Sequence, residues 1–94
     1  MDFLPTILLV DEDPQVRSVM AARLRRLGYR VTEADSATAA RAVVLRDPPT
    51  LILMDRGVPG DGQQARTTLE LLRRDPQLGH IPVLMTSARS ALLS

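Results

Sequence analysis

Residues 6–14 read Thr6-Ile7-Leu8-Leu9-Val10-Asp11-Glu12-Asp13-Pro14, an apolar run that stops abruptly at three acids. Because the run is short, apolar and partly β-branched, it predicts a strand that is covered by helices on both faces. Asp13 can cap a helix with Pro14 at its first position, and apolar residues then recur at helical spacing until Gly28. The stretch therefore predicts a strand, an acidic turn and an amphipathic helix.

The next part of the chain repeats this order. Residues 29–34 alternate in the manner of a second strand. Asp35 or Ser36 is then expected to cap a helix that runs to about Arg46 and ends before two prolines. Residues 51–54 are wholly apolar and predict a third strand, which again ends at an acid, Asp55.

The last third of the chain adds one more helix and strand. A loop rich in turn residues leads to a helix near residues 63–74, with Leu69 and Leu72 facing inward. Residues 81–85 predict a fourth strand that ends at the hydroxyls Thr86 and Ser87. Strands that alternate with helices predict a doubly wound α/β fold with a parallel sheet, in one domain over residues 1–94.

The composition excludes several classes of protein. The 94 residues carry a net charge of +1 without a long run of either sign, so direct nucleic-acid binding is not expected. The absence of cysteine excludes a disulfide framework and a cysteine-based zinc site, and favours the reducing cytoplasm. No apolar run approaches the roughly 20 residues of a membrane span, so no membrane partner is expected. All twelve basic residues are arginine, which excludes chemistry that needs a lysine ammonium group.

The predicted strands all end in polar residues. The carboxyl ends of parallel strands lie along one edge of the sheet, where ligands of doubly wound folds bind. Asp11 and Glu12 follow the first strand and Asp55 follows the third, and such close carboxylates repel one another unless a cation joins them. Mg²⁺ prefers oxygen ligands and commonly binds carboxylates together with phosphate oxygens. A carboxylate can also act as the nucleophile in phosphoryl transfer, so the edge is a candidate phosphoryl-accepting site.

Each of these features has an ordinary structural explanation when taken alone. An acidic triplet before a helix is most often a cap, and a single aspartate at a strand end is most often a turn residue. The combination of acids on two strands with hydroxyls on a third favours a functional site. The single histidine, His80, is expected to be an exposed loop residue and not a ligand.

Three blocks of sequence, residues 7–14, residues 53–59 with Gly62, and residues 81–88, resemble the motifs of the receiver domain of two-component response regulators. The resemblance implies a flavodoxin-like fold, Mg²⁺ as cofactor, and a histidine kinase or phosphotransfer protein as partner. The roles that it implies are a phosphoacceptor for Asp55, metal ligands for Asp11, Glu12 and Asp55, a metal-binding backbone carbonyl for Gly57, and a switch hydroxyl for Ser87. A domain of this kind is not a conventional enzyme.

The sequence also departs from the family pattern. Glu12 stands where aspartate is commoner, and the loop after Pro59 is one residue shorter than usual. The family's fifth strand with its characteristic lysine, the helix before that strand and the helix after it are all missing, so the fold is expected to be incomplete, with four strands and three helices. Because the lysine normally pairs with the phosphoryl oxygens, we expect inefficient phosphorylation.

Two other functions are compatible with parts of the sequence. A pseudo-receiver that keeps the fold and acts only in protein interactions is favoured by the absence of lysine. A phosphatase similar to the haloacid dehalogenases would use Asp11 and Asp13, but that family also needs a lysine and a later acidic motif, which this chain lacks.

The resemblance also leads to a prediction about assembly. In the family's strand order 2-1-3-4-5, loss of the fifth strand makes the fourth strand an edge. Loss of the two flanking helices would also uncover apolar surface on both faces of the sheet near Leu53, Val83 and Met85, which is rare on a soluble monomer. We therefore expect a homodimer, or a higher assembly, that forms through the fourth strand and the residues after it.

Overall fold

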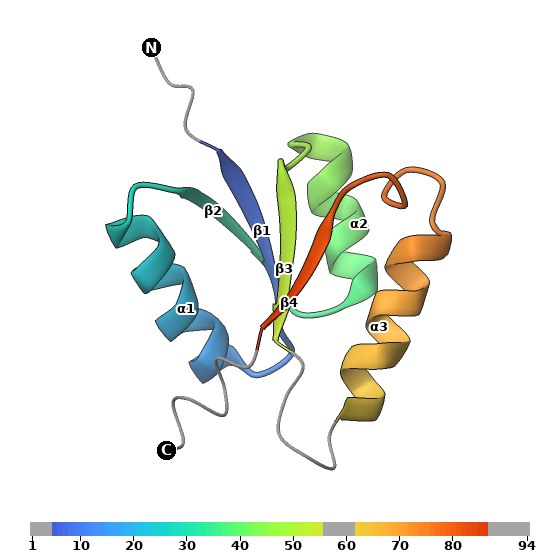
Figure 1. Cartoon of the computed structure of the whole chain (residues 1–94), viewed down its shortest axis with the longest axis horizontal. Coiled ribbons are helices and arrows are strands. Elements are labelled where there is room, and N and C mark those ends of the chain that lie inside the picture. The colour runs from blue at the N-terminus through green and yellow to red at the C-terminus, as the bar shows by residue number, and fades with distance from the viewer. Residues whose placement is uncertain (1–4, 56–61, 87–94) are drawn as a thin grey trace.

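Four parallel strands form one sheet in the order β2-β1-β3-β4, as Figure 1 shows. The computed structural model of the protein describes residues 5–55 and 62–86. The strands are β1 (Thr6–Val10), β2 (Arg30–Ala34), β3 (Leu51–Asp55) and β4 (Val83–Thr86). Since β1 pairs with β2 on one side and with β3 on the other, the strand order reverses beside β1. The predicted doubly wound parallel sheet is confirmed.

Three helices connect the strands and lie in two layers. They are α1 (Pro14–Arg26), α2 (Ala37–Arg46) and α3 (Gly62–Arg74). In Figure 1, α1 covers one face of the sheet, while α2 and α3 cover the other. The described residues thus contain the four strands and three helices that the sequence predicts, and none of these helices is long and apolar enough to cross a membrane.

The helix ends follow from local side-chain chemistry. The Asp13 carboxylate accepts hydrogen bonds from the backbone N–H groups of Gln15 and Val16, which caps α1 as predicted. Ser36, one of the two candidates for the second cap, accepts a hydrogen bond from the N–H of Ala39 at the start of α2. Gly28 follows α1 with φ of 100°, a conformation that favours glycine.

The fourth strand begins two residues later than predicted. Ile81 still belongs to the preceding turn, because its N–H donates to the carbonyl of Leu78 at 3.0 Å. Pro82 has no N–H to give to a strand ladder. The regular strand therefore starts at Val83, and within the described sheet β4 is an edge strand, as predicted.

The core is divided by the sheet into two unequal clusters. The cluster toward α2 and α3 contains Leu8, Val10, Ala34, Ala40, Val43, Val44, Ile52, Met54, Leu72, Leu78 and Ile81 as buried residues. The cluster toward α1 contains Ile7, Leu9, Ala21 and Leu53. Leu69 and Leu72 of α3 both contribute to the first cluster, so the prediction that they face inward is confirmed.

The prediction of uncovered apolar surface is wrong in detail. Leu53 is buried, and Val83 and Met85 are half-buried because they point to the side where α3 packs. Leu84 lies between them on β4 and points to the other face, and its side chain is 55% exposed. The exposed apolar surface of β4 therefore lies on the α1 side of the sheet.

Candidate functional site

Asp11 directly follows β1, at the start of the loop that leads to α1, and it is buried. Its N–H extends the sheet by donating to the carbonyl of Ala34 at 3.0 Å. Its carboxylate accepts a hydrogen bond from the N–H of Asp13 at 2.9 Å, and its carbonyl accepts one from Arg17 Nη1 at 2.7 Å. Ala34 and Arg17 therefore hold the Asp11 backbone, and the Asp13 N–H holds its carboxylate.

The sheet register places Asp55 beside Asp11. Val10 pairs with Met54, so Asp11 and Asp55 occupy the next positions on neighbouring strands, which lie about 4.8 Å apart in a sheet. Both acids are buried, with 9% of Asp11 and 7% of Asp55 exposed. Two acids are rarely buried side by side for structural reasons alone, so this pair is the feature of the described residues that most resembles a functional site.

Thr86 lies next to Asp55 on the outer side of this pair. Asp55 pairs with Thr86 in the register of β3 with β4, and Thr86 is half-buried. The strand ends thus bring together two carboxylates and a hydroxyl, as the sequence predicts. Gly57 and Ser87, the other two predicted site residues, lie outside the described residues.

Glu12 is placed differently from the other two acids. It is exposed, because the chain turns toward α1 between the buried Asp11 and the capping residue Asp13. Among the described residues, no group of three or more histidine, aspartate or glutamate side chains could hold a metal ion. The structure therefore does not gather the three expected carboxylates into one group, and the assignment of Glu12 as a metal ligand stays a prediction.

The chemistry of the donor set fits Mg²⁺ without a third carboxylate. Mg²⁺ is usually bound by one or two carboxylates, keeps several waters, and takes further oxygens from a phosphate group. Asp11 and Asp55 supply two carboxylates at neighbouring positions, and their mutual repulsion would fall when a divalent cation binds. A phosphoryl group could supply the remaining oxygen ligands.

Sequence reasoning missed two residues that support the site. Arg17 lies one turn inside α1 and contacts both the Asp11 carbonyl and the Glu33 carboxylate, the latter through Nε at 3.3 Å. Glu33 also accepts a hydrogen bond from Arg25, at 3.3 Å. The only sequence signal was a charged residue on the strand-facing side of an amphipathic helix, which also has ordinary surface explanations.

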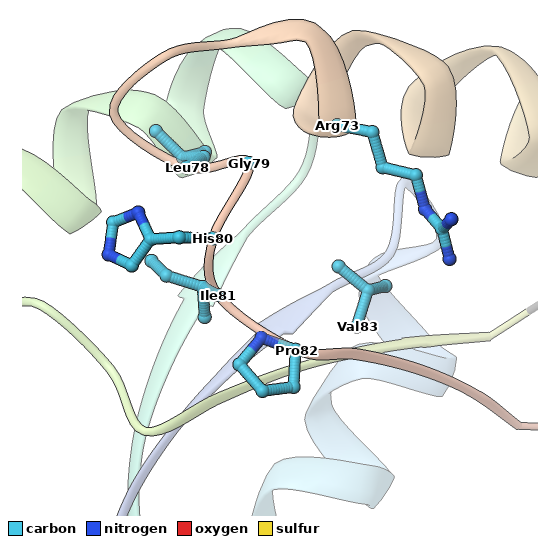
Figure 2. Close-up of a pocket in the computed structure, with 7 residues that line it drawn as sticks. All are labelled: Arg73, Leu78, Gly79, His80, Ile81, Pro82 and Val83. Carbon is cyan, nitrogen blue, oxygen red and sulfur yellow. The ribbon is translucent and has the colours of Figure 1, made fainter.

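A cavity of about 290 Å³ lies at the opposite end of β4. It is lined by Arg73 and residues 78–83. His80 is exposed, as predicted, and Figure 2 shows its ring on the opposite side of the chain segment from the Arg73 side chain. Because these two groups do not converge, the cavity does not form an anion site, and it lies away from the acidic strand ends.

Comparison with known proteins gives consistent matches. The family model of the response regulator receiver domain matches residues 7–93. The chain is 36% identical over 86 residues to the phosphate regulon transcriptional regulatory protein PhoB of Pseudomonas aeruginosa, which covers 89% of this chain and 36% of that protein. It is 33% identical over 85 residues to the chemotaxis protein CheY-3 of Vibrio cholerae, which covers 89% of this chain and 64% of that protein.

A solved structure agrees with these matches. The crystal structure of the N-terminal domain of a response regulator receiver protein from Methanoculleus marisnigri has a TM-score of 0.70 at 40% identity, and the match covers 87% of this chain and 65% of that chain. The chain spans only 34% to 36% of the length of the first three curated relatives. These matches do not favour the alternative of a phosphatase similar to the haloacid dehalogenases.

Proposed function

This chain belongs to the response regulator receiver domain family, and on that premise we propose that it accepts a phosphoryl group on Asp55 with the help of Mg²⁺. Receiver domains are signalling domains of two-component systems and not conventional enzymes. As a family they accept phosphoryl groups from histidine kinases and generally use Mg²⁺. The observation that carries the proposal is the burial of Asp11 and Asp55 at neighbouring positions where the strand order reverses.

The proposed reaction is a transfer between two side chains. An Asp55 carboxylate oxygen attacks the phosphorus atom of a phosphohistidine on a histidine kinase or phosphotransfer protein. A new O–P bond forms, the P–N bond to the donor imidazole breaks, and its electron pair returns to the imidazole nitrogen. Asp55 must be ionised for this attack, and its position at the end of β3 places it at the edge of the sheet that a donor would approach.

The proposed Mg²⁺ ligands are the Asp11, Glu12 and Asp55 carboxylates and the backbone carbonyl of Gly57. When bound, the ion would offset the charge that Asp55 and the phosphoryl oxygens share during the transfer. The Asp11 carboxylate is oriented by the hydrogen bond that it accepts from the Asp13 N–H. Ser87 is proposed as the hydroxyl that closes onto the phosphoryl group.

The absence of lysine in these 94 residues bears on the stability of the product. Without a lysine ammonium group in these residues, we propose that the cation and backbone N–H groups offset the added charge. We therefore propose that phosphorylation of Asp55 in this chain is slow or short-lived. A chain that binds Mg²⁺ and is never phosphorylated would instead act as the pseudo-receiver considered above.

Titration of the full chain with Mg²⁺ tests the metal part of this proposal. Binding should be weak, should perturb the NMR signals of Asp11, Glu12 and their neighbours, and should fall sharply in Asp55→Asn. The matched control is Asp35→Asn, because Asp35 is exposed and directly follows β2 at the same edge of the sheet. Equal Mg²⁺ affinity in Asp55→Asn and in the unchanged chain would contradict the assignment.

We also propose that the chain forms a homodimer through β4. The supporting observations are that β4 is an edge strand of the described sheet and that Leu84 is 55% exposed on it. Unpaired strand edges with apolar side chains tend to pair with another chain, and Pro82 would limit the pairing to residues from Val83 onward.

Sedimentation at micromolar concentration tests the dimer. Leu84→Arg should shift the chain to monomer, whereas Leu45→Arg on α2, at 54% exposure, should not. Leu84 is a better probe than Val83 or Met85, because those two side chains pack against the core and their replacement by arginine would disturb folding. A monomer in the unchanged chain would contradict the proposal.

A further inference from the structure

Arg17 joins three elements of the structure beside the acidic loop, which is formed by residues 11–13 between β1 and α1. From α1 it donates through Nη1 to the carbonyl of Asp11 at 2.7 Å, and through Nε to the carboxylate of Glu33 on β2 at 3.3 Å. Its side chain is only 20% exposed. One guanidinium group therefore holds the end of β1, the first turns of α1 and the last part of β2 together.

The carbonyl that Arg17 holds is part of the peptide between Asp11 and Glu12. A planar peptide with a fixed carbonyl has a fixed N–H direction, so this contact sets the direction in which the chain leaves Asp11. The same loop contains the hydrogen bond from the Asp13 N–H to the Asp11 carboxylate, at 2.9 Å. Movement of the peptide would therefore also move the Asp11 carboxylate relative to Asp55.

Arg25 provides a comparison that separates the Arg17 contact from an ordinary surface ion pair. Arg25 also binds Glu33 at 3.3 Å and a β2 carbonyl, that of Val31, at 3.0 Å. However, its side chain is 52% exposed, and these two contacts both lie on β2. Exposed pairs of this kind contribute little, whereas a short hydrogen bond from a charged donor to a partly buried carbonyl contributes more.

We propose that Arg17 is a positioning residue for the acidic loop, which fixes the Asp11–Glu12 peptide so that Asp11 stays beside Asp55. The role rests on the proposed phosphoacceptor function of this site. Arg17 touches neither reacting atoms nor the cation in this proposal, and it acts through the Asp11 backbone. Glu33 orients the guanidinium and offsets its charge, so that Arg17 can lie near a cation site without a strong repulsive field.

The first test needs no metal. In the metal-free full chain, Arg17→Gln should raise hydrogen exchange at the amides of Asp11 and Asp13 by roughly tenfold, because a charged hydrogen bond to the loop is lost. Arg25→Gln is the matched control, since it removes the same charge from the same cluster and leaves the Asp11 carbonyl bond intact. It should change exchange at these two amides by less than about twofold. Equal exchange in the two variants would overturn the proposal, whether or not the chain binds Mg²⁺.

The second test is the Mg²⁺ affinity of the same variants, measured by titration. Loss of positioning should weaken Mg²⁺ binding by roughly tenfold in Arg17→Gln and leave it nearly unchanged in Arg25→Gln. If the guanidinium acted only by its charge, Arg17→Gln would instead bind Mg²⁺ more tightly, which would overturn the proposal. Absence of Mg²⁺ binding by the unchanged chain would contradict the proposed function alone, because the exchange test would still decide the role of Arg17.

Discussion

The two faces of the sheet differ in how much of the core they carry. Among the described residues, the face toward α2 and α3 packs eleven buried residues into one cluster, whereas the face toward α1 packs four. Along β3 the side chains alternate, so Asp55 points to the same side as Leu53, which belongs to the smaller cluster. The same alternation places Thr86 on the side of the exposed Leu84.

This difference indicates a division of roles between the faces. The larger cluster can account for most of the stability of the fold, and the candidate site continues the face that is more thinly packed. Apolar packing that surrounded the acids on every side would exclude water and ions, and would penalise their charged forms. Among the described residues, the sparser face places less apolar packing beside the buried carboxylates.

The largest expected effect on stability comes from substitutions at two neighbouring residues of β1. Leu8 and Leu9 are both fully buried, but Leu8 belongs to the larger cluster and Leu9 to the smaller one. Leu8→Ala should lower the free energy of unfolding by about 4 kcal/mol and Leu9→Ala by about 2–3 kcal/mol, because a thinly packed site relaxes more around the cavity. Urea unfolding measures both values, and an equal or larger loss in Leu9→Ala would remove the distinction between the faces.

Replacement by alanine of the glycines that follow α3 and α1 should have a smaller effect on stability. A Cβ on Gly79 would lie 2.7 Å from the Arg73 carbonyl oxygen, so the turn beside the larger cluster would have to move. A Cβ on Gly28 would meet no atom within 4 Å, and only its φ of 100° is unfavourable. We expect Gly79→Ala to cost about 2–3 kcal/mol and Gly28→Ala about 1 kcal/mol. The reverse order in thermal unfolding would show that backbone conformation outweighs steric contact here.

The smallest expected effect on stability comes from replacing a buried polar group on the side of the larger cluster. Thr32 is the register partner of Leu8, so it points toward the larger cluster, and its buried Oγ1 has no hydrogen-bond partner among the described residues. Replacement by valine removes this unsatisfied hydroxyl and keeps the β-branched shape. Thr32→Val should therefore raise the free energy of unfolding by about 1 kcal/mol. A loss of stability would mean that the hydroxyl has a partner, such as an ordered water.

Much of the architecture could be predicted from the sequence because it depends on local signals. The apolar run of β1, the Asp13 cap with Pro14 after it, and the strand-end position of Asp55 are all visible as patterns along the chain. The neighbouring positions of Asp11 and Asp55 then follow from parallel pairing.

The parts that could not be predicted depend on packing between distant segments. The exposure of Glu12 depends on where the loop turns, and the role of Arg17 depends on the contact of α1 with β2, sixteen residues away along the chain. The burial of Leu53 was likewise missed, because the sequence pattern does not reveal how far α1 covers β3.

The most direct test of the central claim is phosphorylation of the full chain by a small phosphodonor with Mg²⁺, followed by intact mass measurement and peptide mapping. We predict slow addition of one phosphoryl group to Asp55, which requires Mg²⁺, disappears in Asp55→Asn and persists in the control Asp35→Asn. Addition that survives in Asp55→Asn, or no addition at all to a folded chain that binds Mg²⁺, would contradict the assignment of Asp55 as the phosphoacceptor.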